Sequence, residues 1–210
     1  MNLTPPLPAR TLTVSGLACR RGERLLFTGL NVSLSAGEAL LLRGPNGAGK
    51  TTLLHALAGI VTPEAGTITI EGRDPEARPG TDLHLIGHLP GIKARLTVQE
   101  NLAFWAAING GNGAVEAALE TVGLGAIPRL QAGHLSAGQT RRLALGRLLV
   151  SPRPIWLLDE PTAALDTAGE ALVGRLIDAH LDAGGMMIAA THHDLALSRP
   201  PRTLAVGKAD

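Results

Sequence analysis

The sequence predicts an α/β fold, in which a mostly parallel core sheet carries an inserted helical segment and an antiparallel edge. Three observations favour this fold. Apolar runs at 38–44 and 154–160 are typical of short strands buried in a parallel sheet. A glycine-rich loop at 44–49 joins the first of these runs to a helical pattern. Residues 97–150 have helical patterns and contain no convincing strand.

The first half of the chain is predicted to consist mainly of strands. Polar and apolar residues alternate in the half-buried strands, whereas the buried strands are continuous apolar runs. A helical pattern covers 50–60, with Gly59 near its predicted end. The strands of this half are predicted at 11–16, 31–35, 38–44, 67–72 and 83–87.

The second half begins with helices and returns to strands. The predicted elements are helices at 97–108, 114–124, 138–150 and 167–181 and strands at 154–158, 186–190 and 203–206. We therefore expect a single domain over residues 1–210. Its core is expected at approximately 11–88 and 151–208, with a helical subdomain at approximately 97–150.

Composition and charge argue against several classes of function. The formal net charge of +1 gives no indication of a nucleic-acid partner. Cys19 is the only cysteine, so neither an intramolecular disulfide nor a multi-cysteine metal site is possible. No window reaches the roughly 18 apolar residues of a membrane span, so work at a membrane would depend on docking to another subunit. Four histidines are expected to be core or surface residues rather than metal ligands: His55, His84, His134 and His180.

The segment GPNGAGKT at 44–51 fits the phosphate-binding pattern G-x-x-x-x-G-K-[S/T]. Glycines allow such a loop to fold back, so that several backbone N–H groups face one anion. Lys50 is expected to reach the β- and γ-phosphates, and the Thr51 hydroxyl to bind Mg²⁺. A chance glycine-rich turn is the alternative, and the strand before the loop and the helix after it argue against that. The predicted nucleotide-binding residues are Gly44, Pro45, Asn46, Gly47, Ala48, Gly49, Lys50, Thr51 and Thr52.

The segment IWLLDEP at 155–161 is an apolar strand that ends in two acids. Successive side chains of a strand point to opposite sides, so Asp159 and Glu160 are expected to have different roles. Asp159 is suited to the Mg²⁺ shell, and Glu160 to polarising a water for in-line attack on the γ-phosphate. A strand end that is merely solvated by two acids is the alternative, and the loop at 44–51 argues against it.

The segment HLSAGQTRR at 134–142 has the pattern of a helix start, with Ser136 at the cap position. Free backbone N–H groups at such a start form a second phosphate-binding site. A single chain does not need two such sites for one nucleotide. The second site is useful if it serves a second copy of the chain. Arg141 and Arg142 are candidates for phosphate ligands or, alternatively, for a solvated helix face.

In order and spacing, GPNGAGKTT, LSAGQ, LLDEP, ALD at 164–166 and the TH of THHD at 191–194 resemble the motifs of ABC-type ATPases. LSAGQ is similar to the signature of that family, usually LSGGQ, and the resemblance covers nearly the whole chain. It implies a P-loop NTPase core of the ABC type with an antiparallel β edge and a helical signature subdomain. It also implies ATP hydrolysis, with ATP and Mg²⁺ as cofactors.

The same resemblance implies a head-to-tail dimer with a second copy of the chain. In that dimer the signature of one copy caps the ATP held at 44–51 of the other, and Asp166 belongs to the loop that crosses the interface. His192 matches the histidine that contacts the γ-phosphate, and the Thr–His order favours it over His193. Glu160, His192 and Lys50 are the implied catalytic residues. The implied signature residues are Leu135, Ser136, Ala137, Gly138 and Gln139.

Two positions depart from the pattern of the family. Where most relatives have a glutamine this chain has His88, which either helps to hold Mg²⁺ or only links the two subdomains. Many relatives stack adenine on an aromatic residue, but here the matching place is near Arg20 and Arg21. A guanidinium could stack on the base, or the base is held loosely, and we expect weak discrimination between bases.

Within the family, the stretch IGHLPGIKARLTVQENLAFW at 86–105 is similar to the ATPase subunits of bacterial cytochrome c maturation systems, which are described as haem exporters. That similarity implies a translocase motor bound to the cytoplasmic face of the bacterial inner membrane. Its membrane partners would dock on 88–96 and on the helix of Phe104 and Trp105, which also fits an ordinary core helix. Two alternatives remain: an exporter motor for another small molecule or lipid, and a soluble P-loop kinase.

Overall fold

The computed structural model describes residues 6–74, 76, 80–111 and 114–207, and it confirms the predicted α/β fold. The predicted ends of the domain at 1 and 210, and the predicted core boundary at 208, lie outside these residues. The antiparallel sheet has the strand order β2-β1-β4. Its strands are β1 (Thr11–Arg21), β2 (Arg24–Ser35) and β4 (Ala65–Glu71).

The second sheet is parallel and has the strand order β5-β6-β7-β3-β8. Its strands are β3 (Ala39–Arg43), β5 (Leu83–Ile86), β6 (Ile155–Asp159), β7 (Met186–Ala190) and β8 (Arg202–Ala205). Strands from both halves of the chain therefore share one sheet, and the carboxyl ends of β3, β6 and β7 meet at the same edge. Open α/β sheets bind ligands at this edge.

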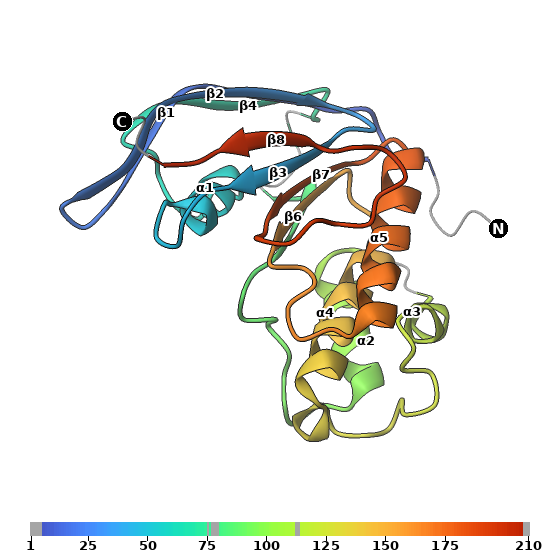
Figure 1. Ribbon diagram of the computed structural model, residues 1–210. Helices are drawn as coiled ribbons and strands as arrows, with labels where there is room; N and C mark the ends of the chain where they lie inside the picture. Colours follow the sequence, from blue (N-terminus) through green and yellow to red (C-terminus); the bar gives the residue numbers. More distant parts are fainter. Residues whose placement is uncertain (1–5, 75, 77–79, 112–113, 208–210) are drawn as a thin grey trace.

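The helices lie where their periodicity predicts them. They are α1 (Lys50–Leu57), α2 (Val98–Ile108), α3 (Val115–Thr121), α4 (Ala137–Val150) and α5 (Thr167–Asp182), with a 3₁₀ turn, η1 (Ala132–His134). Figure 1 shows α2, α3 and α4 gathered at the end of the molecule opposite the antiparallel sheet. Among the described residues, none of the helices is long and apolar enough to cross a membrane.

The parallel sheet separates two hydrophobic clusters. Ile155 and Leu157 of β6 pack with α1 and the antiparallel sheet, whereas Trp156 and Leu158 pack with the helices α2 to α5. The alternation of side chains along a strand therefore explains why β6 is apolar throughout. Burial on both faces fixes the position of the strand end, where the acids lie.

The hairpin of β1 and β2 is longer than predicted. The alternating patterns at 11–16 and 31–35 cover only the half of the hairpin that lies far from its turn. The strands continue from there to the turn at Gly22. Gly16 and Gly29 have φ values of 60° and 64°, and shifts in the β1–β2 register accompany them. Such bulges interrupt the polar–apolar alternation and hide the rest of the hairpin from a pattern-based prediction.

Candidate functional site

The glycine-rich loop runs from β3 to the first turn of α1. Gly44 and Gly49 have φ values of 150° and 104°. A Cβ atom at Gly44 would lie 2.2 Å from the carbonyl oxygen of Val206, and one at Gly49 would lie 3.0 Å from Phe27. Space and backbone conformation therefore both require glycine here. The loop is held in a shape that directs the start of α1, which has no side-chain cap, toward a cleft.

The cleft lies along the loop, at the carboxyl edge of the parallel sheet. The β1–β2 hairpin forms one wall, and the ends of β6 and β7 form the other. Its lining residues are Arg21, Arg24, Leu26, Asn46, Gly47, Gly49, Lys50, Thr51, Thr52, His88, Asp159, Glu160 and His192.

Lys50 is held beneath the loop. Its ammonium group donates to the carbonyl oxygens of Gly44 at 2.7 Å and Pro45 at 3.2 Å, and its Nζ atom lies 3.2 Å from Nε2 of His192. Only 8% of the residue is exposed. The loop therefore fixes the position of a positive charge in the wall of the cleft.

Asp159 and Glu160 both line the cleft, although the prediction placed them on opposite sides of a strand. The reason is that β6 ends at Asp159 and Glu160 has a φ of 47°, a left-handed conformation that turns the chain. The two acids nevertheless contact different groups. The Thr51 hydroxyl donates to Oδ2 of Asp159 at 2.9 Å, whereas Oε1 of Glu160 lies 3.9 Å from Nε2 of His192.

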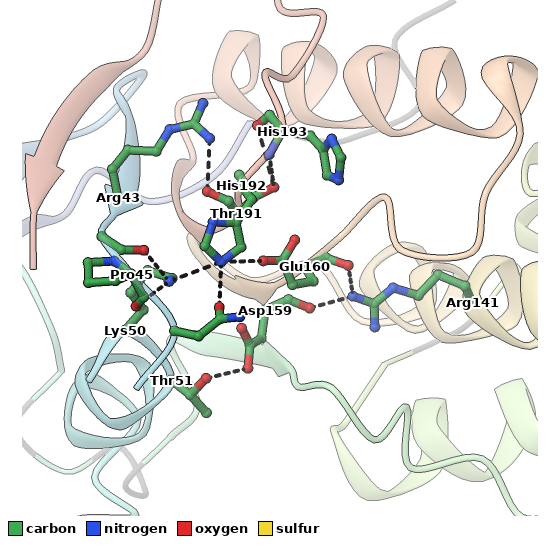
Figure 2. Close-up of polar contacts among 12 residues, drawn as sticks. Arg43, Pro45, Lys50, Thr51, Arg141, Asp159, Glu160, Thr191, His192 and His193 are labelled. Carbon is green, nitrogen blue, oxygen red and sulfur yellow. Dashed lines mark hydrogen bonds and ion pairs between the residues drawn. The ribbon is translucent and has the colours of Figure 1, made fainter. Parts of the chain in front are cut away.

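His192 points into the cleft and His193 points away from it (Figure 2). Nε2 of His192 lies 2.9 Å from Oδ1 of Asn46. Lys50 can only donate, so Nε2 accepts from Lys50 when it is unprotonated and donates to Asn46 or Glu160 when it is protonated. The ring can therefore exchange partners within the cleft according to its tautomer.

Arg141 is neither a phosphate ligand nor part of a solvated helix face, and both expectations for it are wrong. It is buried, and its guanidinium donates to the backbone carbonyls of Asp159 and Glu160 (Figure 2). The packing of α4 against the end of β6 turns this side chain inward, which the helix pattern alone does not reveal. Arg142 is half-buried and lines a hollow at the start of α4.

Four of the five predicted signature residues line this hollow, and Leu135 is the exception. Ser136 caps α4 as predicted, because its hydroxyl accepts from the N–H of Gln139 at 3.2 Å and the Gln139 side chain accepts from the N–H of Ser136 at 2.9 Å. Asp166 similarly caps α5 by accepting from Gly169 at 2.8 Å. The lining residues are Ser136, Ala137, Gly138, Gln139, Arg142, Ala164, Leu165 and Asp166, and the cleft shares none of them.

The structure also places the two departures from the family pattern. His88 is exposed and lines both the cleft and a neighbouring hollow that includes Leu135 of the signature segment. Arg20 is not among the lining residues and forms an ion pair with Glu64, whereas Arg21 lines the cleft.

Sequence reasoning missed two residues of the hairpin wall, Arg24 and Leu26. Arg24 pairs with Arg21 across the hairpin turn, and it also lines the cleft. The hairpin register would have identified both residues, but the bulges in β1 and β2 conceal that register from the sequence pattern.

Comparison with known proteins places these motifs in one family. The family described as ABC transporter matches residues 27–163. The cytochrome c biogenesis ATP-binding export protein CcmA of Rhodopseudomonas palustris strain BisB5 is 49% identical, covering 94% of this chain and 98% of that protein. CcmA of Rhizobium meliloti strain 1021 is 50% identical, covering 89% of this chain and 93% of that protein.

Solved structures support the fold alone. An ABC transporter ATP-binding protein from Pyrococcus furiosus superposes with a TM-score of 0.78 at 23% identity, covering 93% of this chain and 97% of the other. A bacterial Atm1-family ABC exporter with ATP bound gives a TM-score of 0.80 at 23% identity, covering 95% of this chain and 37% of the exporter chain. The chain belongs to the ABC transporter family of nucleotide-binding ATPases, and within it to the group of cytochrome c biogenesis ATP-binding export proteins.

Proposed function

We propose that the chain is the ATP-hydrolysing motor subunit of a membrane ABC transporter that serves cytochrome c maturation. One observation carries the catalytic part of the proposal. Lys50, Thr51, Asp159, Glu160 and His192 come from the first turn of α1 and from the ends of β6 and β7, and they line one cleft. We further propose that residues 1–210 form one ATPase domain, with its core at approximately 11–88 and 151–208 and a helical subdomain at approximately 97–150.

In this proposal the loop and the first turn of α1, residues 44–52, bind the phosphates of ATP through backbone N–H groups and the ammonium of Lys50. Thr51 and Asp159 fit a magnesium ion, because both present hard oxygen donors to the cleft and these oxygens lie 2.9 Å apart. Bound there, Mg²⁺ would neutralise phosphate charge and thereby favour phosphoryl transfer.

Glu160 is proposed to accept the proton of the attacking water, and His192 to contact the γ-phosphate. The 3.9 Å separation of Oε1 of Glu160 and Nε2 of His192 supports a shared task. A histidine that can exchange Lys50 for Asn46 as its partner is also suited to a group that meets a phosphate oxygen. Lys50 completes the proposed catalytic set by holding positive charge beside the transferred phosphoryl group.

A head-to-tail dimer with a second copy is the proposed assembly. It is supported by the separation of the cleft from the signature hollow, which have no lining residue in common. In the dimer, Leu135, Ser136, Ala137, Gly138 and Gln139 of one copy would cap the nucleotide of the other, with Asp166 in the loop at the interface. The N-terminal N–H groups of α4 are chemically suited to meet phosphate oxygens.

The names of the relatives support the proposed system. ATP hydrolysis would drive either haem delivery or release of a haem-loaded chaperone, at the cytoplasmic face of the bacterial inner membrane. The proposed partners are integral membrane subunits of the cytochrome c maturation machinery. Leu89, which follows His88 and is 84% exposed, is proposed as a contact for them. Trp105 is less suited, because the guanidinium of Arg147 lies 3.5 Å above its ring.

The proposal is tested by capture of the complex from membranes of the native host in mild detergent. Tagged Glu160→Gln protein with ATP and Mg²⁺ should retain its membrane partners, which mass spectrometry identifies and absorbance spectroscopy examines for haem. The same variant without nucleotide is the control. Recovery of cytochrome c maturation proteins is expected. Recovery of other polytopic proteins would leave the ATPase in place and overturn the haem system.

A further inference from the structure

The guanidinium of Arg141 connects α4 to two distant segments of the fold. It is 6% exposed, and all three of its nitrogens donate to backbone carbonyls. Nη2 donates to Asp159 and Glu160, and Nε donates to Pro161 at 3.3 Å. Nη1 donates to Gly87 at 3.0 Å. A buried cation is costly unless its donors are satisfied, so these contacts fix the carbonyls relative to the helix.

One of these carbonyls belongs to Glu160, whose backbone is in an unfavourable conformation. A φ of 47° persists for a non-glycine residue only when its surroundings enforce it. The N–H of Glu160 donates to Ala190 at 2.8 Å, and its carbonyl accepts from Arg141 and from Ala163 at 3.1 Å. Of these three partners, only Arg141 belongs to α4. Loss of Arg141 would free the peptide after Glu160 to rotate, and would move its carboxylate relative to His192.

A second contact joins α4 to the same loop. A Cβ atom at Gly138 would lie 2.9 Å from the carbonyl oxygen of Ala164, which also has a positive φ of 63°. The first turn of α4 therefore packs closely against the chain that follows Glu160. The contact of Arg141 with Gly87, the residue before His88, extends this connection to the end of β5, next to a residue that lines the cleft.

We propose that Arg141 is a positioning residue that sets the orientation of the Glu160 carboxylate according to the position of the signature helix α4. The inference rests on the proposed ATPase function of the cleft. Movement of α4, for instance when its first turn meets the nucleotide of a second copy, is thereby transmitted to Glu160 through the side chain of Arg141. Arg141 acts through the backbone of Glu160, and it is not among the residues that line the cleft.

Arg147 provides a matched control on the same helix. It is 7% exposed and donates to the carbonyl oxygen of Pro90 at 2.8 Å, so its burial and its type of bond are the same. Its carbonyl partner, however, lies in the segment after His88 instead of the loop after β6. Arg147→Met should therefore also remove a buried guanidinium from α4 and destabilise the fold, without affecting Glu160 directly.

The first measurement is amide hydrogen exchange of the full chain, followed by mass spectrometry of the peptide that covers 159–166. Arg141→Met should increase exchange in this peptide by roughly tenfold, because the bond that fixes the Glu160 carbonyl is lost. Arg147→Met should leave it within about twofold of the wild type. Equal exchange in the wild type and in Arg141→Met would overturn the proposal.

The second measurement is ATP hydrolysis by the chain in complex with its membrane subunits. Arg141→Met should lower kcat on the order of 100-fold, since misplacement by about 1 Å has such an effect. The KM for ATP should change less than about threefold, because the phosphate-binding loop is untouched. An equal loss of kcat in Arg147→Met would show a general effect of stability and would also overturn the proposal.

Arg141→Lys is the second variant, and it keeps the measurement interpretable if the methionine variant does not fold. Lysine retains the charge but lacks the planar fork that reaches several carbonyls, so kcat should stay at least about tenfold below the wild type. Full activity with lysine would contradict positioning by the fork. If the wild-type complex did not hydrolyse ATP, the proposed function would fail, and hydrogen exchange would still decide whether Arg141 positions Glu160.

Discussion

The Thr51 hydroxyl donates a hydrogen bond of 2.9 Å to Oδ2 of Asp159 and so joins the first turn of α1 to the end of β6. The two residues lie 108 positions apart in the chain. Both sequence motifs that suggested nucleotide chemistry therefore meet in one pair of oxygen atoms. This pair is the proposed magnesium site, and it predicts a specific pattern of substitutions.

Thr51→Val should weaken magnesium-dependent hydrolysis, whereas Thr51→Ser should preserve it. Valine has nearly the shape of threonine but no hydroxyl, so the proposed ligand is lost with little change in packing. Loss of one charge-assisted contact corresponds to a roughly 10- to 100-fold fall in kcat/KM. Titration of turnover with Mg²⁺ measures the effect. Similar magnesium dependence in the valine and serine variants would remove Thr51 from the site.

Glu160→Gln should bind ATP but hydrolyse it about 10² to 10⁴ times more slowly, the usual contribution of a general base. Glutamine preserves the shape of the side chain but cannot accept the proton of a water. Retained ATP should stabilise the dimer, which size-exclusion chromatography with and without ATP detects. Full turnover in this variant would exclude Glu160 as the base.

Ser136→Asp should fold normally and fail to turn over ATP. Aspartate caps a helix as well as serine does, so α4 keeps its N-terminal hydrogen bond. Its negative charge would, however, repel a phosphate approaching from a second copy. Thr97→Asp is the matched control, because Thr97 caps α2 in the same way through Glu100. A thermal melt checks folding, and equal ATPase rates in both variants would argue against the proposed dimer.

Local patterns predicted the framework of the site. The strand before Gly44, the helix after Gly49 and the cap at Ser136 each depend on residues within one or two turns of the chain. Glycines at positive φ, short apolar runs and capping residues are local signals. The two motifs therefore appear at their predicted places on the predicted elements.

Arg141 and Glu160 show where local patterns fail. The burial of Arg141 depends on carbonyls 18 and 19 residues away and on one 54 residues away, so an arginine in a helix resembles a solvated residue until the fold is known. The left-handed turn at Glu160 is enforced by tertiary bonds, and glutamate itself gives no signal for it. The alternation of side chains along a strand, which the prediction used, therefore does not extend to Glu160.

Weak discrimination between nucleotide bases is a further expectation. The hairpin wall of the cleft presents Arg21, Arg24 and Leu26, and a guanidinium can stack on any base without reading its edge. The kcat/KM values for ATP and GTP should agree within about threefold. Stacking on a guanidinium does not depend on the hydrogen-bonding edge of the base, which is where adenine and guanine differ. Steady-state phosphate release with each nucleotide tests this. A large preference for ATP would contradict weak discrimination between bases.

Arg24→Ala should raise the KM for both nucleotides in parallel if Arg24 supports the base by stacking. Loss of about 0.5 to 1 kcal/mol of such contact corresponds to a roughly two- to fivefold rise. Arg20→Ala is the control, because Arg20 forms an ion pair with Glu64 outside the cleft. A change in only one of the two KM values would show that Arg24 reads the base.

Acid should destabilise the fold because His84 and His180 are buried as neutral rings. Burial lowers the pKa of His84 to about 3 and that of His180 to about 4. Arg153 and Arg147 nearby lower the pKa of His84 further, whereas the backbone carbonyl of Ser151 raises it. His180 also stacks on Trp156 with ring centroids 3.8 Å apart, which holds it in this environment.

The direction in which pH changes the free energy of unfolding follows from the protons that the folded and the unfolded chain bind. Above pH about 6.5 both rings are neutral in the folded and the unfolded chain, and stability is complete. As the pH falls below that value, the unfolded chain binds two protons that the folded chain excludes until the pH approaches 4 and 3. The free energy of unfolding should therefore drop by roughly 2 to 3 kcal/mol between pH 7.5 and 5.5.

Reversible urea unfolding at several pH values in this range measures the loss. His84→Gln should roughly halve it, because glutamine can still donate to Ser151 but binds no proton when the chain unfolds. His193→Gln is the control, since this histidine is exposed and should leave the pH dependence unchanged. If His84→Gln keeps the full pH dependence of the wild type, the buried histidine is not its source.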